Sequence, residues 1–226
     1  MAENELAEWA AGIAAKPYGE RIYTATRIAT EQVLFRILDI RHEGTENLKV
    51  EPPVIVAPVH RSNLDSLTVG TLGRRRLPTL AKESLFGVKP VAWWLAGLGA
   101  IPLDRDAADR EATKAARQIL DSGKPLMIFP EGTRQTGHEI GDLFDGTVWI
   151  AAKAHASIVP VGISGTEAAL PAGSKFPKRS AVGVVAGEPI VMPDGRVPRS
   201  RLTELTELMR DRLQAANDRA RELARN

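Results

Sequence analysis

The chain has no cysteine among its 226 residues. This absence excludes thiol nucleophiles, thiolate metal sites and disulfides, so that any side-chain nucleophile must be oxygen or nitrogen. Long apolar runs are also missing. The longest stretch without a charge, residues 90–103, has 14 residues and contains glycines and two prolines, whereas a membrane-spanning helix needs roughly 20 apolar residues. Any contact with a membrane is therefore expected to be peripheral.

The N-terminus lacks the features of a secretory signal. Residues 1–16 carry glutamates where a signal peptide has a basic start and an apolar stretch. We therefore expect a cytoplasmic location.

The chain has little net charge of either sign, with a formal value of +2. That is too small to indicate nucleic acid as a partner. Basic residues do cluster locally, at Arg74–Arg76 and at Lys175–Arg179. Such clusters are usually solvated faces, but an apolar ring among cations, as in the second cluster, also suits an anionic lipid surface.

The hydrophobic pattern predicts a helical pair followed by alternating strands and helices. Residues 3–16 and 18–41 have helical periodicity. Beyond Gly44, short apolar runs alternate with helical segments, which indicates a mostly parallel sheet covered by helices on both faces. We therefore predict a single α/β domain, with residues 1–41 as an N-terminal helical pair and 42–226 as the main unit. The predicted strands are 54–59, 77–81, 100–103, 125–129, 157–163 and 181–186, and the predicted helices in this unit are 63–72, 88–98, 107–120, 146–155 and 199–224.

The second helix of the pair has a wide apolar stripe. Ile22, Val33 and Ile37 recur at helical spacing, and arginines are interleaved with them. Such a stripe fits packing against the core or contact with a membrane surface, and we keep both interpretations.

A histidine and an aspartate follow the first predicted strand. His60 comes directly after that strand, and Asp65 lies five residues on, in the first turn of the next helix. A neutral imidazole suits removal of a hydroxyl proton near pH 7. A carboxylate on its far nitrogen would fix the tautomer and stabilise the imidazolium that forms.

Other interpretations of this segment remain open. Asp65 can be an ordinary first-turn acid of a helix capped by Ser62 or Asn63, with His60 at a strand end. A triad with Ser62 as nucleophile is disfavoured, because no G-x-S-x-G turn surrounds it. Metal binding is disfavoured as well, since the histidines are not spaced as ligands.

A second polar segment, Phe129–Arg134, follows another predicted strand. The guanidinium of Arg134 is suited to binding phosphate through two hydrogen bonds. Glu131 can accept a hydrogen bond from an acceptor hydroxyl, and Gly132 allows close approach of the backbone. Alternatively, this segment is a polar turn with Thr133 as a cap.

Two more cations follow predicted strands. Arg105, after the strand at 100–103, is a further phosphate candidate, and Lys82, after the strand at 77–81, adds positive potential at the same rim. Each is also compatible with an ordinary position on the surface. Strand ends of a parallel sheet are where catalytic groups collect.

Four blocks in this order resemble the glycerophospholipid acyltransferase family, of the lysophosphatidate (1-acylglycerol-3-phosphate) acyltransferase type. The blocks are His60 with Asp65, Gly99 through Asp104-Arg105, Phe129–Arg134, and Val159-Pro160-Val161 before Gly165. The resemblance implies that His60 is the general base and Asp65 its orienting partner. It also implies that Arg105 and Arg134 bind the acceptor's phosphate, assisted by Glu131 and Gly132. We predict Lys82 and Thr133 as further substrate-binding residues.

The resemblance implies direct transfer of a fatty acyl group to the free hydroxyl of a lysophospholipid, chiefly lysophosphatidate. The donor would be acyl-CoA or acyl carrier protein, with no cofactor and no metal. The protein would act at the inner face of a membrane. Acylation of glycerol 3-phosphate or a glycolipid, and a non-catalytic lipid-binding module, are the alternatives.

Overall fold

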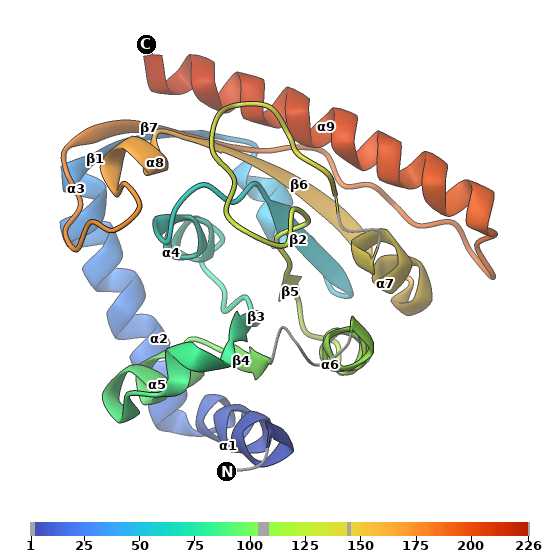
Figure 1. The fold of residues 1–226 in the computed structure, drawn as a ribbon, viewed down its shortest axis with the longest axis horizontal. Helices are drawn as coiled ribbons and strands as arrows, with labels where there is room; N and C mark the ends of the chain where they lie inside the picture. Colours follow the sequence, from blue (N-terminus) through green and yellow to red (C-terminus); the bar gives the residue numbers. More distant parts are fainter. Residues whose placement is uncertain (1–2, 104–108, 144–145, 226) are drawn as a thin grey trace.

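The computed structural model describes residues 3–103, 109–143 and 146–225, and its centre is a seven-stranded sheet with the order β1-β7-β6-β2-β5-β3-β4 (Figure 1). All neighbouring strands run parallel except β6 and β7. The strands are β1 (Leu38–Glu43), β2 (Val54–Pro58), β3 (Thr79–Lys82), β4 (Ala100–Leu103), β5 (Leu126–Met127), β6 (Ser157–Ser164) and β7 (Ser180–Ala186).

Helices cover the sheet, and short helical turns join them to it. The α-helices are α1 (Glu3–Ala15), α2 (Pro17–Ala29), α3 (Phe35–Ile37), α4 (Leu64–Leu72), α5 (Lys89–Gly97), α6 (Asp109–Asp121), α7 (Gly146–Ala154), α8 (Thr166–Ala169) and α9 (Arg199–Arg225). A π-helical turn, η1 (Thr30–Leu34), joins α2 to α3, and two 3-10 turns are η2 (Thr45–Lys49) and η3 (Glu83–Phe86).

The strand directions place several distant segments at one edge of the sheet. The five strands β2 to β6 are parallel and end at what we call the carboxyl edge. Since β7 is antiparallel to β6, and β1 is parallel to β7, these two strands begin at that same edge. The segment after β2, the turn η1–α3 before β1 and the loop before β7 therefore reach the carboxyl edge together.

The C-terminal helix packs very closely on β6 and β7. Glycines lie at the contact, because a Cβ atom on Gly162 would collide with the backbone of Ala216, and one on Gly183 with the backbone of Ala220. Ala216 and Ala220 are one helical turn apart and buried. Small residues on both sides thus let α9 lie directly on the sheet.

The N-terminal helices form a smaller apolar cluster with α5. Ala10 and Ile13 of α1 are buried with Ala92 and Ala96 of α5. Two aromatic contacts join α2 to α5: the Tyr18 and Trp93 rings stack at 5.7 Å, and the Trp94 indole donates a hydrogen bond to the Thr26 hydroxyl at 2.9 Å. Packing of α1 and α2 on the rest of the chain is therefore part of the fold.

The predicted fold class is confirmed: the structure is an α/β domain with a mostly parallel sheet and N-terminal helices. The prediction of one helix over residues 18–41 is wrong at its end, because helix stops at Ile37 and residues 38–43 form β1. Leu38 and Ile40 satisfy both a helical and an alternating pattern, and pairing with β7 selects the strand. Strand β5 is also shorter than the predicted 125–129.

Candidate functional site

His60 and Asp65 are brought together at the end of β2. The Nδ1 atom of His60 lies 3.2 Å from Oδ2 of Asp65. The chain leaves β2 at Pro58 and turns into α4 at Leu64, so that the aspartate in the first helical turn faces back toward the histidine. The spacing of five residues therefore produces the predicted contact.

The Asp65 carboxylate is fully buried and saturated with donors. Oδ2 accepts the backbone N–H groups of Arg61 and Ser62, each at 2.7 Å, and Oδ1 accepts the hydroxyl of Thr166 at 2.7 Å. These donors offset the cost of burying a charge. Asp65 is thus a first-turn acid of α4 and at the same time the partner of His60. The helix start has no side-chain cap, because Asn63 at the N-cap position makes no such hydrogen bond.

The imidazole of His60 is held in place and keeps one nitrogen free. Its ring stacks on Phe129 with centroids 4.0 Å apart, and 14% of the side chain is exposed. With Asp65 ionised, Nδ1 donates its proton to Oδ2, which leaves a lone pair on Nε2. Nε2 makes no hydrogen bond with the residues that the structure describes. This nitrogen can therefore accept a proton from an incoming hydroxyl.

Glu131 has a different place from the one expected. We predicted that it accepts a hydrogen bond from the acceptor hydroxyl, but its side chain is 0% exposed. Oε2 accepts the N–H of His60 at 3.1 Å and pairs with the Arg61 guanidinium at 2.6 Å, and Oε1 accepts the N–H of Gly141 at 3.3 Å. The carboxylate therefore holds the backbone of the histidine segment rather than facing solvent.

The last three residues of the second polar segment are exposed. Gly132 has a φ of +69° with open space where a Cβ would lie. Thr133 is exposed and accepts a hydrogen bond from Gln135 at 3.1 Å, and Arg134 is exposed as well. The Gln135 N–H donates to the carbonyl of His60 at 2.9 Å. The segment that carries Arg134 is thus tied to the one that carries His60.

The two remaining predicted cations follow more distant strands. Lys82 is exposed at the end of β3, which is separated from β2 by β5. Arg105 lies outside the described residues, and it follows β4, the strand next to β3. The carboxyl edge thus includes Lys82, while its side-chain relation to His60 stays a prediction.

Three residues that position the site were missed from the sequence. Arg61 is buried and donates to Glu131 and to the carbonyls of Gly137, Glu139 and His60. An arginine directly after a predicted base was the available signal.

Thr166 was missed as well, and Ser62 was considered only as a helix cap or a nucleophile, not as a residue that positions the site. Thr166 follows Gly165, whose φ of +94° directs the chain from β6 into α8, and no local pattern links a threonine to an acid 101 residues earlier. Ser62 is buried, and its hydroxyl donates to the Leu170 carbonyl at 3.3 Å. Since that proton is directed to Leu170, the geometry does not form a Ser62–His60 triad.

The loop after the second polar segment is braced by α9. His138 pairs with Asp218 at 2.6 Å, and Asn217 donates to the His138 carbonyl at 2.7 Å. The hydrogen bonds from His138 and then Gln214 hold the pKa of Asp218 below its ordinary value. Arg210 donates to the Gly141 carbonyl at 2.7 Å. The backbone that supports Glu131 is therefore anchored to the C-terminal helix.

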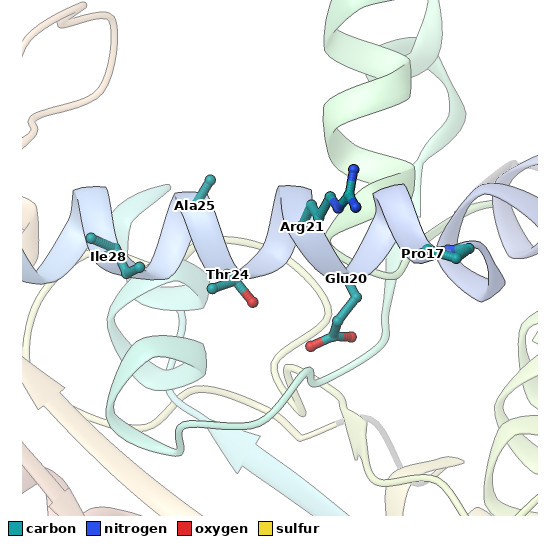
Figure 2. A pocket seen from close by; sticks show the side chains of 6 residues that line it. All are labelled: Pro17, Glu20, Arg21, Thr24, Ala25 and Ile28. Carbon is teal, nitrogen blue, oxygen red and sulfur yellow. The ribbon is translucent and has the colours of Figure 1, made fainter.

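A shallow hollow on the outside of α2 contains none of the predicted site residues. It is lined by residues on one stripe of that helix, as Figure 2 shows: Pro17, Glu20, Arg21, Thr24, Ala25 and Ile28. Nothing on this stripe resembles a proton-transfer site. Within the described ranges, no three histidine, aspartate or glutamate side chains are grouped as they would be around a metal ion.

The fold and this geometry together place a histidine paired with a buried carboxylate at the carboxyl edge of a parallel α/β sheet. A histidine aimed by a buried carboxylate, with no serine or cysteine hydrogen-bonded to it within the described residues, can activate a substrate's own hydroxyl.

Comparison with known proteins gives the family. Residues 39–164 match the family described as Acyltransferase, which is more than half of the chain, and the chain belongs to that family. It is 28% identical over 181 residues to the 1-acyl-sn-glycerol-3-phosphate acyltransferase of Bacillus subtilis, covering 79% of this chain and 88% of that protein.

Two further similarities concern a longer plant protein and a solved structure. The chloroplastic 1-acyl-sn-glycerol-3-phosphate acyltransferase LPAT1 of Arabidopsis thaliana is 29% identical over 145 residues, which are 63% of this chain and 40% of that protein. The chain thus matches about two fifths of such longer relatives. The crystal structure of the 1-acyl-sn-glycerophosphate acyltransferase PlsC from Thermotoga maritima has a TM-score of 0.70 at 25% identity, covering 91% of this chain and 79% of that one.

Proposed function

We propose that this protein transfers a fatty acyl group from an acyl thioester to the free hydroxyl of lysophosphatidate, which gives phosphatidate. The single observation that carries this proposal is the His60–Asp65 pair, whose Nδ1–Oδ2 contact of 3.2 Å leaves Nε2 free at the carboxyl edge. The relatives named 1-acyl-sn-glycerol-3-phosphate acyltransferase support this choice of acceptor.

In the proposed reaction the acceptor hydroxyl attacks the thioester carbonyl as His60 Nε2 takes its proton. A C–O bond forms, the C–S bond breaks, and the proton held by His60 passes to the departing thiolate. Asp65 stabilises the imidazolium that exists between these transfers. Since no residue of the protein is acylated, the missing cysteine is no obstacle.

The acceptor's phosphate requires a cationic site near His60. Arg134 is the leading candidate, because it is exposed on the segment tied to His60 by the Gln135 N–H. We infer further contributions from Gly132 and Thr133 beside it, and from Lys82 and Arg105 at neighbouring strand ends. Arginine is favoured for this task because its planar guanidinium forms paired hydrogen bonds to phosphate.

The substrates are lipids, and we infer that the protein docks on a membrane through an apolar face formed by α2, η1, η3 and α5. Eight of the twelve exposed large hydrophobic residues among those described lie there: Tyr18, Ile28, Val33, Leu85, Val88, Val91, Trp93 and Trp94. Tryptophan and tyrosine favour the membrane interface. Of the described helices, none is long and apolar enough to cross a bilayer.

The acyl donor and the location of the protein are two further parts of the proposal. Both acyl-CoA and acyl carrier protein present a thioester, and we propose that one of them is the donor. The inner face of a membrane, with the protein itself in the cytoplasm, stays the predicted location.

An acceptor panel tests the proposed activity. The purified chain is incubated with acyl-CoA or acyl carrier protein and with lysophosphatidate, glycerol 3-phosphate or a glycolipid, while free thiol and acylated product are measured. We expect thiol release with lysophosphatidate and an equal amount of phosphatidate. Product only from another acceptor would replace lysophosphatidate as substrate, and vesicle binding without thiol release from either donor would indicate a lipid-binding module.

A further inference from the structure

The loop between α8 and β7 carries a cluster that the proposed chemistry does not use. Its tip is Phe176, which is 80% exposed, and Lys175, Lys178 and Arg179 beside it are exposed as well. We name residues 175–179 the basic loop. We propose that the basic loop binds the surface of an anionic phospholipid bilayer, with the Phe176 ring inserted among the lipids and the three cations against their phosphates.

The base of this loop is fixed to the rest of the domain. The Lys178 N–H donates to the Ala169 carbonyl at 2.7 Å, and the Ser174 N–H donates to the Pro171 carbonyl at 3.0 Å. The exposed ring is therefore presented by a closed loop. At the start of the same segment, the Leu170 carbonyl accepts the Ser62 hydroxyl at 3.3 Å, so that the loop is connected to the residues around His60.

The loop lies at the edge of the sheet where the site is. It leads into Ser180, which pairs with Leu38, and since β1 and β7 are parallel, the turn η1–α3 reaches the sheet beside it. That turn carries Val33, which is 60% exposed, and the exposed Arg36. Figure 1 shows α2, α8 and the loop after α8 on the left side of the view. The basic loop thus lies at the same edge of the sheet as the η1–α3 turn and the His60 segment.

Charge and exposure together favour a lipid surface. An exposed aromatic ring has affinity for the interfacial layer of a bilayer, and lysines and arginines near an anionic surface each contribute about a fivefold gain in binding. On the neighbouring strand β1, Asp39 is paired with Arg41 at 3.0 Å. An acidic carrier protein could pair with the same three cations, but such ion pairs do not account for the solvent-exposed phenyl ring of Phe176.

The experiment compares vesicle binding by the full chain and two charge-matched variants. The test variant is Lys175→Gln/Lys178→Gln/Arg179→Gln. The control variant, Lys124→Gln/Arg196→Gln/Arg199→Gln, removes the same charge from exposed positions toward the opposite edge of the sheet, where β5 begins and α9 starts. Flotation is measured with vesicles of phosphatidylcholine alone and with 30% phosphatidylglycerol added.

We expect the test variant to lose on the order of 100-fold in affinity for the anionic vesicles, since three charges are removed, and to match the wild type on neutral ones. This difference should shrink as salt is raised. Phe176→Ala should weaken binding to both vesicles by roughly tenfold, whereas Val191→Ala, at a position 73% exposed near the opposite edge, should not. Equal losses in the two charge variants, or none in the test variant, would overturn the inference.

This inference deepens the proposed membrane docking and rests on it, and a second measurement separates their failures. Thiol release from acyl-CoA and a water-soluble short-chain lysophosphatidate, without vesicles, should be the same in the test variant and the wild type. Loss of activity only with acyl carrier protein, with vesicle binding retained, would assign the loop to that protein instead. A wild type that binds no vesicle would end both docking proposals and leave the chemistry standing.

Discussion

At the scale of single residues, the site depends on how one buried carboxylate is satisfied. Asp65 receives two backbone amides, a hydroxyl and the His60 ring, and it has no exposed surface. Each donor lowers the free energy of the ionised form and fixes the direction of its oxygens. The orientation of His60 is therefore set by residues from the β2–α4 connection, α4 and α8 together.

Thr166 gives the most selective test of this arrangement. Replacing it with valine removes the hydroxyl from Asp65 while keeping the shape, so that the free energy of unfolding should fall by about 1.5–3 kcal/mol, the worth of a hydrogen bond to a charged group. Thr166→Ser should regain most of that loss and most of the activity. Urea denaturation and initial rates across pH would measure both, and equal losses in the valine and serine variants would show that the hydroxyl is not responsible.

The buried Arg61–Glu131 pair makes a second residue-scale prediction. Removing one partner leaves an uncompensated buried charge, so that Arg61→Met and Glu131→Leu should each lower the free energy of unfolding by about 3–5 kcal/mol. The combination Arg61→Met/Glu131→Leu should cost less than the two losses added. A double-mutant cycle by chemical denaturation measures the coupling, and strict additivity would contradict a direct pair.

At the scale of elements, α9 connects the sheet to the loop that supports Glu131. It packs on β6 and β7 through facing glycines and alanines, and its polar residues bond to residues 138–141. The helix thus stabilises the fold and the site at once.

The space around two glycines, one packed against α9 and one open to solvent in α1, predicts opposite effects on stability when each is replaced by alanine. Gly183→Ala should lower the free energy of unfolding by about 3 kcal/mol, the upper end of the usual range for overpacking, because its methyl group meets the backbone carbonyl of Ala220. Gly12→Ala, in α1 with nothing near its Cβ position, should raise it by about 0.5–1 kcal/mol. Thermal and urea unfolding of both variants provide the comparison, and a tolerated Gly183→Ala would contradict the contact.

The contrast between β2 and β1 shows what the sequence could predict at this scale. The run Val54–Pro58 is wholly apolar and bounded by turns, so that its strand and the polar residues after it were predictable. Strand β1 was not predictable, because Leu38 and Ile40 fit both a helical and an alternating pattern. Only pairing with β7, in which Leu38 lies opposite Ser180, 142 residues later, selects the strand. Long-range pairing of this kind leaves no local signal.

The same limit applies to the site. His60 and Asp65 are five residues apart, and their contact followed from the geometry of a strand and a helix start. The carboxylate of Glu131 is a suitable group for a substrate contact. It is instead paired with the guanidinium of Arg61, which lies 70 residues earlier in the chain. Tertiary contacts determine which polar residues face solvent. They therefore determine whether a polar residue positions other residues of the site or can bind the substrate.

At the scale of the whole molecule, the proposed base and the proposed membrane contact lie at the same carboxyl edge of the sheet. His60, the segment of Arg134 and the basic loop reach this edge from three parts of the chain. A membrane-bound acceptor would then meet the proposed base at this same edge. The topology of the sheet, with its one antiparallel pair, is what brings the loop before β7 to this side.

The proposed reaction depends most on His60 as the general base, and one measurement tests this role directly. Thiol release from acyl-CoA in the presence of lysophosphatidate is compared for wild type, His60→Ala and His42→Ala, the last at an exposed histidine of β1. We predict that His60→Ala lowers kcat about 10²- to 10⁴-fold while the variant stays folded, and that His42→Ala matches wild type. A folded His60→Ala variant with wild-type turnover would contradict the account.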